Sequence, residues 1–277
     1  MIEPIVLQRC SKCKESLPKE AYSQSQWGRP GFMCRWCGRQ RKMEHDFGIT
    51  VTKADIESMF LRQRGKCLAC LKPISLNAGK CNKMAAVVDH SHNTGIVRGL
   101  LCRMCNLALG ALDENAGTLR RLMVYLDYDR SKLQVYLAGS LRNPRVPIIA
   151  MDLRAAGYDV MDDWYAAGAT ADDSWQAYET ARGHSYEEAL RGRAAQNTFL
   201  FDKAHLDLSD LLIAVLPCGK SAHLEMGYFV GQGKPVFILQ EGVQGRFEIM
   251  PNFVTKVFNS LEELQLEVDL TFQLKKG

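Results

Sequence analysis

The stretch "VVDHSHNTGIVRGLLCRMCN", residues 87–106, holds two histidines, one aspartate and two cysteines within twenty positions, and it ends in an asparagine. Thiolates are soft ligands that suit zinc, whereas carboxylate and amide oxygens are hard ligands that suit Mg²⁺ or Mn²⁺. Cys102 and Cys105 therefore indicate part of a structural zinc site. Asp89 and Asn106 indicate a separate site for a catalytic cation, which would leave a neighbouring histidine free to act as a base.

The cysteines extend this pattern toward the N-terminus, because nine of the ten lie in residues 10–105. In a reducing compartment, C-x2-C pairs indicate metal sites rather than disulfides. A secreted disulfide framework is the alternative, but the opening "MIEPIVLQRC" lacks the basic region and the apolar core of a signal peptide. The sequence therefore predicts two structural zinc ions, held by the pairs Cys10/Cys13, Cys34/Cys37, Cys67/Cys70 and Cys102/Cys105.

The spacing of the pairs predicts two different zinc-bound segments. Twenty residues separate the first two pairs, which suits a zinc ribbon within residues 1–45. Between Cys70 and Cys102 lie 31 residues that include "DHSH", so the second quartet belongs to a larger domain, residues 46–130. Cys81 and Cys218 have no partner in the pattern and are expected to be ordinary thiols.

Charge also divides the chain of 277 residues, which is long enough for two modest domains. Residues 1–132 carry a net charge of +10, whereas residues 133–277 carry −6. A basic half that also contains zinc pairs suits the phosphate backbone of nucleic acid. The apolar runs are far shorter than the roughly 20 residues that a membrane helix needs, so we expect a cytoplasmic protein with no membrane contact.

The second half, residues 133–277, alternates strand-like and helix-like segments, which predicts parallel βαβ units. Strands are expected in "LQVYLAGS" (133–140), "YDVMDDW" (158–164), "LLIAVL" (211–216) and "KPVFIL" (234–239). Residues 172–207 form a long helical insertion, expected to be a lid or a partner surface. In the first half, helices are expected over 52–65, from Cys102 onward and over 116–126.

Residues 8–127, with "CLAC", "VVDHSHNTGIVRGLLCRMCNLALG" and the preceding "CSKC" and "CRWC", resemble the recombination endonuclease VII family, a branch of the HNH or ββα-metal nucleases. The resemblance implies a zinc-stabilised α+β domain that cleaves DNA. Ser91 departs from the family, because many members have a second aspartate there.

That resemblance implies a role for each matched residue. Asp89 and Asn106 would bind Mg²⁺ or Mn²⁺, which would stabilise the charge of the reacting phosphate. His90 would activate the attacking water, and His92 would position a phosphate or polarise the site. Arg98 would contact backbone phosphates of the DNA. The alternative is a zinc module that binds nucleic acid without cleaving it.

In the second half, "VYLAGSLRN", "FDKAHLDLSDLLIAVLP" and "SAHLEMGYFVGQGKPV" resemble the nucleoside 2-deoxyribosyltransferase-like family, which includes deoxynucleotide N-glycosidases, over residues 133–240. The resemblance implies a flavodoxin-like, Rossmann-type α/β domain. Glu225 would be the nucleophile, Asp202 the proton donor to the leaving base and Tyr136 the group that orients the glutamate. The pocket for the sugar or its 5′-phosphate would be lined by Gly139, Ser140, Arg142 and Ser221.

Three questions stay open at this level. Glu225 could instead be a carboxylate that stabilises the start of a helix. The tryptophans of "DDW" (162–164) and "SWQAY" (174–178) could stack on a base or belong to the core. The second domain could bind a deoxynucleoside or deoxynucleotide without turnover, as a sensor. We expect a phage-type protein of a bacterial or phage-infected cell whose partner is DNA, and which could form a homodimer.

Overall fold

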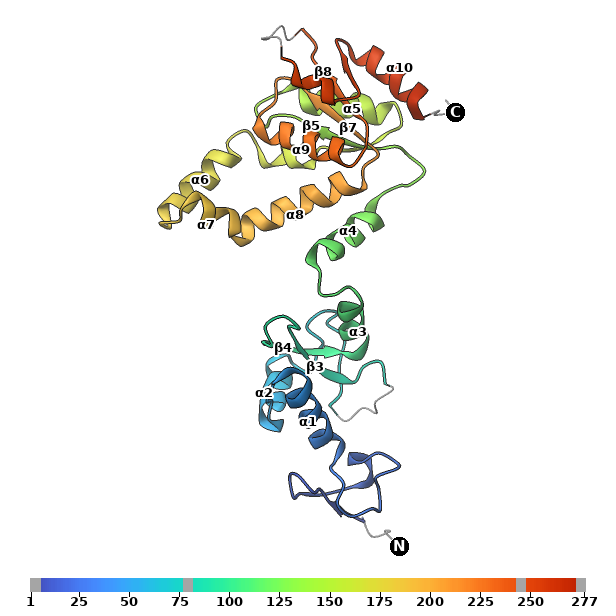
Figure 1. The fold of residues 1–277 in the computed structure, drawn as a ribbon, viewed down its shortest axis with the longest axis vertical. Coiled ribbons are helices and arrows are strands. Elements are labelled where there is room, and N and C mark those ends of the chain that lie inside the picture. Colours follow the sequence, from blue (N-terminus) through green and yellow to red (C-terminus); the bar gives the residue numbers. More distant parts are fainter. Residues whose placement is uncertain (1–5, 77–81, 243–247, 273–277) are drawn as a thin grey trace. The chain divides into compact units, whose positions relative to one another are not determined.

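The computed structural model describes residues 6–76, 82–242 and 248–272, and the chain divides into two compact units (Figure 1). Unit 1 is Met1–Glu114 and unit 2 is Asn115–Gly277. Cys81, expected to be an ordinary thiol, lies outside the described residues. Among those residues, no helix is both long and apolar enough to cross a lipid bilayer.

Unit 1 begins with a small two-stranded ribbon. β1 (Gln8–Arg9) pairs antiparallel with β2 (Ser16–Leu17). The turn between them is tight because Lys14 takes a left-handed backbone with φ of 63°, and its amide donates to the Cys10 carbonyl over 3.1 Å. Tyr22 is the large buried side chain of this ribbon, and it packs among the cysteines. So small a core needs a further source of stability.

The helix α1 (Arg35–Phe47) starts at the second cysteine pair of the ribbon. Cys34 is its N-cap, and the Cys34 sulfur accepts a hydrogen bond from the Cys37 amide over 3.4 Å. Gly48 ends the helix in the left-handed conformation with φ of 65°. The helix therefore continues through residue 45, where the sequence analysis placed the end of the ribbon segment.

The centre of unit 1 is a strand–strand–helix arrangement. β3 (Ala86–His90) and β4 (Val97–Cys102) form an antiparallel hairpin, and α3 (Arg103–Ala111) follows directly. As at α1, a cysteine caps this helix: the Cys102 sulfur accepts from the Cys105 amide over 3.4 Å. The predicted ββα fold of this region is confirmed.

The helix α2 (Lys53–Arg62) begins at a capping box of Thr52 and Asp55, in which the Thr52 amide donates to the Asp55 carboxylate over 2.8 Å. It packs against the hairpin through its apolar face. The buried core of this part of unit 1 is small and includes two of the cysteines: Ile49, Val51, Ile56, Met59, Cys67, Ile74, Leu100, Leu101 and Cys102.

Unit 2 is built on a five-stranded parallel sheet. Its strand order is β6-β5-β7-β8-β9, which is 2-1-3-4-5 when the strands are counted within the unit, the flavodoxin-like order. The two central strands β5 and β7 are buried on both faces, so they are almost wholly apolar. The predicted parallel α/β fold is confirmed by β5 (Gln134–Ala138), β6 (Asp159–Met161), β7 (Leu211–Val215), β8 (Val236–Leu239) and β9 (Lys256–Phe258).

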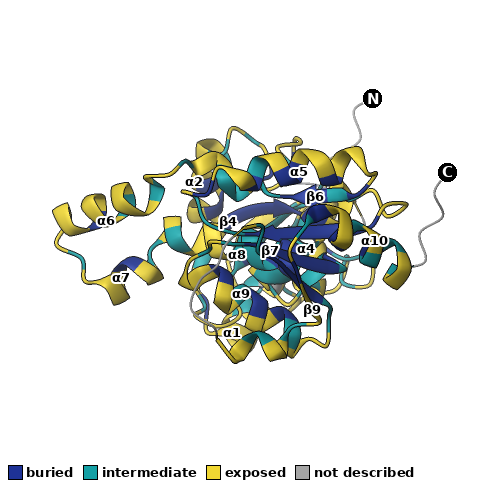
Figure 2. Cartoon of the chain, turned by 90° about the horizontal axis from the view of Figure 1, so that it is seen from above, coloured by how far each residue is buried: buried dark blue, intermediate teal, exposed yellow. Residues whose placement is uncertain are grey.

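Helices cover both faces of this sheet (Figure 2). The core under α5 (Arg145–Ala155) and α10 (Leu261–Phe272) lies on one face. The core under α8 (Arg193–Leu208) and α9 (Lys220–Gly231) lies on the other. The strand β9 and the helix α10 had no signal in the sequence analysis. The short 3-10 helices of the described chain are η1 (Lys19–Ala21), η2 (Asp163–Ala167) and η3 (Met250–Phe253).

The segment expected as one long insertion is divided by the structure. Its last helix, α8, packs on the sheet as a regular part of the fold. Only α6 (Ala171–Ala181) and α7 (Tyr186–Arg191) are additional, and they meet through an edge contact between Trp175 and Tyr186 at 6.4 Å between ring centroids.

The helix α4 (Ala116–Asp127) belongs to unit 2, although the sequence analysis grouped it with the preceding domain up to residue 130. Its N-cap is Asn115, and it packs along α8. Arg120 donates to Asn197 over 2.8 Å, at an exposed position of that contact. The boundary between the two compact units lies between residues 114 and 115, because α4 packs along α8.

Candidate active sites

The eight paired cysteines gather in two groups of four, as their spacing predicted. In each group the four sulfurs lie within 4.8 Å of one another, and none of the described cysteines forms a disulfide. Burial opposes ionisation of the Cys10 thiol, yet backbone amides led by that of Cys34 donate to its sulfur and lower its pKa to about 6. The Cys67 pKa falls to about 7 in the same way. Four thiols at this spacing, with amides directed at the sulfurs, are compatible with a structural zinc ion.

A glutamine and a glycine fix the hairpin that follows the second quartet. Gln63 completes the ladder of β4 with its side chain: its Oε1 accepts from the Leu100 amide over 2.8 Å, and its Nε2 donates to the Leu100 carbonyl over 2.9 Å. Gly99 has φ of 150°, and a Cβ there would lie 2.6 Å from Leu68 Cδ1. The sequence analysis missed Gln63, because a lone glutamine at a helix end carries no distinctive signal.

Asp89, expected as a metal ligand, is the second-last residue of β3 and a buried carboxylate with 7% of its surface exposed. Arg98, expected on phosphates, binds both of its oxygens: Nε donates to Oδ2 over 2.7 Å and NH2 to Oδ1 over 3.0 Å. The same guanidinium donates to Glu114 over 3.0 Å, and this contact holds the pKa of Glu114 below its ordinary value. Glu114 therefore belongs to the site, although no sequence motif marked it.

His90 lies beside this pair at the end of β3. Its Nε2 is buried and has no hydrogen-bond partner among the described residues. Burial, followed by the nearby His92, lowers the pKa of His90 below its ordinary value, so the ring is neutral at neutral pH. A neutral imidazole whose buried ring nitrogen has no partner among the described residues is suited to accept a proton.

Phe47, the last residue of α1, forms one wall of the site and was missed by the sequence analysis. Its ring stacks on His92 at 5.7 Å between centroids and tilts against His90 at 4.4 Å. The Nδ1 of His92 lies 3.6 Å from a Glu114 oxygen. The helix that starts at the first cysteine quartet therefore ends at the two histidines.

Asn106 lies in the first turn of α3, one residue after Cys105, and is half-buried. Its helix packs on β3 and β4, the strands that carry the aspartate and the histidine. The cysteine quartet thus holds the start of α3 and the end of the hairpin together.

A second site lies on the α8–α9 face of the sheet in unit 2. Tyr136, in the middle of β5 and fully buried, donates its hydroxyl to a Glu225 oxygen over 3.1 Å. Asp202 lies on α8, and its Oδ1 is buried without a partner among the described residues. The structure therefore brings Tyr136 and Glu225 into contact as expected from the sequence.

Burial dominates the electrostatics of these carboxyl groups. It raises the pKa of Glu225 to about 7, with a further increase from the charge of Asp202 and an opposing effect of the Tyr136 hydrogen bond. It also raises the pKa of Asp202 to about 6. Glu225 is the sixth residue of α9, beyond the first turn, where the helix dipole has little effect. Perturbed carboxyl groups of this kind are typical of functional sites.

The loop after β5 carries three of the predicted ligand-binding residues. Gly139 has no room for a side chain, because a Cβ would lie 2.7 Å from Val146 Cγ2. Ser140 accepts from the Arg142 amide over 3.2 Å, while the Arg142 guanidinium pairs with Asp173 of α6 over 2.7 Å. Ser221 is exposed in the first turn of α9.

Two further residues organise this loop. Asn143, 4% exposed, donates to the Pro217 carbonyl over 3.3 Å and accepts from the Arg145 amide over 3.0 Å, so it ties the loops after β5 and β7 together. It was not singled out from the sequence. Trp164 donates its indole N–H to the Leu137 carbonyl over 2.8 Å and packs in the core, which favours the core alternative for this tryptophan.

Comparison with known proteins supports the first site. Residues 39–128 match the family model of recombination endonuclease VII, which confirms the resemblance expected for the N-terminal half. The gene 59 protein of Mycobacterium phage D29 is 38% identical over 77 residues, which are 27% of this chain and 43% of that protein. The gene 59 protein of Mycobacterium phage L5 is 42% identical over 65 residues, 23% and 36% of the two chains. The chain thus spans less than half the length of these relatives.

Three solved structures are also similar. A CMP N-glycosidase of Clostridium botulinum matches at 16% identity and a TM-score of 0.31, over 49% of this chain and 97% of that one. A 2-deoxyribosyltransferase of Bacillus psychrosaccharolyticus matches at 17% identity and a TM-score of 0.31, over 47% and 89%. The ββα-Me type II restriction endonuclease Hpy99I matches at 22% identity and a TM-score of 0.21, over 44% and 65%.

Proposed function

We propose that unit 1 is a metal-dependent DNA endonuclease. The observation that carries the proposal is the pair Asp89–His90 at the end of a ββα hairpin, where the His90 Nε2 is buried and lacks a partner among the described residues. A module that only binds nucleic acid has no use for a neutral, partly buried imidazole beside a buried carboxylate. The match to the endonuclease VII family over residues 39–128 supports the same conclusion.

In this proposal each group has one task. Asp89 and Asn106 provide the hard oxygens that would hold Mg²⁺ or Mn²⁺, and the ion would stabilise charge on the reacting phosphate and the leaving 3′-oxygen. His90 takes a proton from the attacking water, and His92 positions a phosphate oxygen. The two cysteine quartets hold zinc, which fixes the helices and strands that present these groups.

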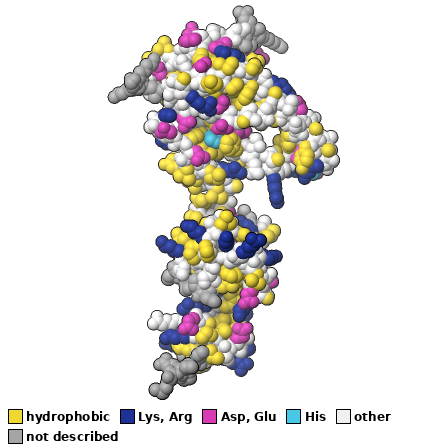
Figure 3. Space-filling model, turned by 180° about the vertical axis from the view of Figure 1, so that it is seen from behind, with side chains coloured by type: hydrophobic (Ala, Val, Ile, Leu, Met, Phe, Trp, Pro, Cys, Tyr) yellow, Lys and Arg dark blue, Asp and Glu magenta, His cyan; other side chains and the backbone are white. Residues whose placement is uncertain are grey.

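Arg98 orders the site before DNA binds. It holds Asp89 against Glu114, and a carboxylate has about four acceptor positions, so Asp89 can keep this contact and still offer an oxygen to a cation. Lys and Arg side chains gather on the visible face of unit 1 (Figure 3), where they would contact the phosphate backbone. Contact of Arg98 itself with a phosphate would require it to share its guanidinium with Glu114.

Nicking of supercoiled plasmid tests the endonuclease. We expect cleavage with Mg²⁺ or Mn²⁺ and none with EDTA. His90→Ala should slow cleavage by about 10²–10⁴-fold, the usual loss for a general base. The matched control is His45→Ala, which removes an exposed histidine of the same unit and should cleave normally. DNA binding without any cleavage by the wild-type protein would favour the binding module instead.

A second candidate function belongs to unit 2, and the contact of Tyr136 with Glu225 favours it. We infer that Glu225 attacks C1′ of a deoxyribosyl group, so that a C1′–O bond forms as the C1′–N bond to the base breaks. Asp202 gives its proton to the departing base. Water, or a second base, then releases the sugar from Glu225. Gly139, Ser140, Arg142 and Ser221 would hold the sugar or its 5′-phosphate.

Release of free base from deoxynucleosides or their 5′-monophosphates tests this chemistry. Glu225→Gln should abolish turnover and keep ligand binding, whereas Glu267→Gln, a carboxyl group on α10, should change neither. The rate should peak near pH 6–7, because the carboxyl pair must carry one proton and its pKa values are about 6 and about 7. Binding without base release by the wild-type protein would favour the sensor.

The whole chain would then be a phage-type protein of a bacterial or phage-infected cytoplasm that acts on DNA and on a deoxynucleoside or deoxynucleotide. We propose three domains: a zinc ribbon in residues 1–45, a nuclease in 46–130 and a transferase-like domain in 133–277. A homodimer would be consistent with this proposal and is testable by light scattering.

A further inference from the structure

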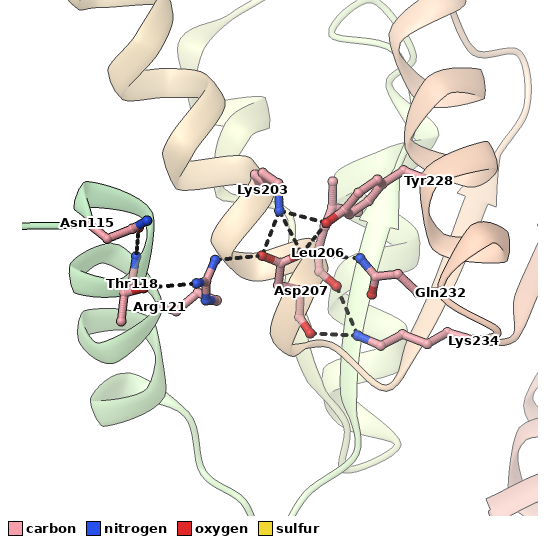
Figure 4. Close-up of polar contacts among 9 residues, drawn as sticks. All are labelled: Asn115, Thr118, Arg121, Lys203, Leu206, Asp207, Tyr228, Gln232 and Lys234. Atoms are coloured by element: carbon pink, nitrogen blue, oxygen red, sulfur yellow. Dashed lines mark hydrogen bonds and ion pairs between the residues drawn. The ribbon is translucent and has the colours of Figure 1, made fainter. Parts of the chain in front are cut away.

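Beyond the proposed active site, α8 and α9 are joined by a dense polar cluster around Asp207 (Figure 4). We name Asp207, Lys203, Tyr228 and Gln232 the Asp207 cluster. Lys203 lies 2.9 Å from Asp207 and 2.6 Å from the Tyr228 hydroxyl. Tyr228 donates to Asp207 over 2.5 Å, and Gln232 donates to it over 3.2 Å. Two residues of α8 are thus bound to two residues at the end of α9.

These residues are close in sequence to the two carboxyl groups of the proposed site. Lys203 follows Asp202 directly on α8, and Asp207 lies five residues after Asp202, roughly 7.5 Å along the helix axis. Tyr228 lies three residues after Glu225 on α9, within one helical turn of it. The same two helices, α8 and α9, therefore carry both the Asp207 cluster and the carboxyl groups of Asp202 and Glu225.

The carboxyl groups themselves give α8 and α9 a reason to separate. Both are partly buried, and repulsion between them adds to the cost of ionising Glu225. Wider spacing would admit water and relieve both penalties. Besides its own helix, Glu225 faces Tyr136 from β5, Asp202 from α8 and Cys218 from the loop before α9, and none of these is a cation. The attraction that holds α8 and α9 together against this repulsion must therefore come from other residues of unit 2.

We propose that Asp207 is a positioning residue for the carboxyl pair. With Lys203, Tyr228 and Gln232 it holds α8 and α9 at a fixed spacing. At that spacing the carboxyl groups of Asp202 and Glu225 stay close to each other and shielded from bulk water. The Asp207 side chain is 13% exposed, and its ion pair with Lys203 is therefore screened less than a surface pair. This inference rests on the proposed chemistry of unit 2 and names a group that does not touch the substrate.

Two neighbouring contacts provide internal controls. Arg121 of α4 also binds Asp207, over 3.2 Å, but it connects α4 with α8 and does not reach α9. Lys234 donates to the carbonyls at the end of α8, including that of Asp207 over 2.6 Å, and these bonds do not involve the Asp207 carboxylate. Loss of Arg121 should weaken the packing of α4 and leave the spacing of α8 and α9 unchanged.

The test is the pKa of Glu225, measured in the full chain by ¹³C NMR of labelled glutamate carboxyl groups, with Glu225→Gln to assign the signal. In the wild type it should titrate near 7. In Asp207→Asn it should fall by about one unit toward the ordinary value, because water reaches the pair. Tyr228→Phe removes one hydroxyl and should lower it in the same direction, which covers the case in which Asp207→Asn does not fold.

Arg121→Met and Glu267→Gln should leave the Glu225 pKa unchanged. An unshifted Glu225 pKa in folded Asp207→Asn and Tyr228→Phe overturns the proposal, and so does an equal shift in Arg121→Met, which would assign the effect to docking of α4. The pKa is measured without substrate. A wild-type protein that releases no base would therefore refute the proposed chemistry, while the NMR result would still decide the role of Asp207.

Discussion

The two units place reactive groups by different physical means. In unit 1 the core is small. Asn106 lies on α3, which begins at Cys102, and Asp89 and His90 lie on β3, which pairs with the strand that ends at Cys102. In unit 2 the strands β5 and β7 are buried throughout, and this core forces Asp202, Tyr136 and Glu225 out of water. The first framework depends on ligands to a metal ion, and the second depends on apolar burial. Loss of one zinc ligand should therefore unfold the region around that zinc ion. A single core substitution should only lower the stability of unit 2.

The largest effect should follow loss of a zinc ligand. We expect two zinc ions per chain by elemental analysis, and Cys102→Ser should remove one of them. Metal binding by structural zinc sites is worth roughly 10–16 kcal/mol, so the ββα region should lose its protection from proteolysis while unit 2 stays resistant. Cys218→Ser is the matched control and should keep both ions. One zinc or none in wild-type protein purified without chelator would contradict the metal framework.

A substitution in the core of unit 2 should destabilise unit 2 and leave unit 1 unaffected. Ile213, fully buried in β7, loses three methyl or methylene groups in Ile213→Ala, which should destabilise unit 2 by about 2–5 kcal/mol. Urea unfolding followed by the tryptophans of unit 2 measures the change. Zinc content and plasmid nicking should remain normal. Loss of zinc from this variant would show that the two frameworks are not independent.

Removal of a buried charge should stabilise unit 2 in a manner that depends on pH. The pKa of Asp202 is about 6 in the folded protein, above its ordinary 3.8, so the folded state holds more protons and stability falls as pH rises through about 6. Asp202→Asn should therefore gain on the order of 1–3 kcal/mol at pH 7.5 and nothing at pH 4. Thermal unfolding between these pH values measures the gain. A less stable variant at pH 7.5 would mean that Asp202 is not held against water.

The smallest effects should come from the helix caps. Thr52 caps α2 in unit 1 and Ser185 caps α7 in unit 2, each in a capping box. Replacement of either by alanine should cost about 1 kcal/mol. In the zinc-bound protein, Thr52→Ala should lower the stability of unit 1 alone. Ser185→Ala should lower the stability of unit 2 alone. Hydrogen exchange of the amides in each helix separates the two results.

Much of the architecture could be predicted because its signals are local. Ligand type and spacing predict the cysteine quartets, and three of the five strands of unit 2, β5, β7 and β8, are largely apolar runs that are buried throughout. The strand β9 has only three residues, two of them at least partly exposed, so it lacks such a run. Similarly, chain order alone could not place α4 beside α8, because Arg120 of α4 and its partner Asn197 of α8 are 77 residues apart in the sequence.

The residues of the candidate sites also fall into two groups, those that stand in sequence motifs and those that do not. Asp89, His90, Asn106 and Glu225 stand in motifs, so the sequence alone singles them out as candidate reactive groups. Phe47, Gln63, Glu114, Asn143 and Asp207 have no motif, because their roles depend on partners that the folded chain brings from other elements. The sequence determined which chemical groups are present and which metals they suit. The tertiary structure alone decided which groups lie beside them and how far each is buried, because pKa and contact depend on distance and dehydration in three dimensions.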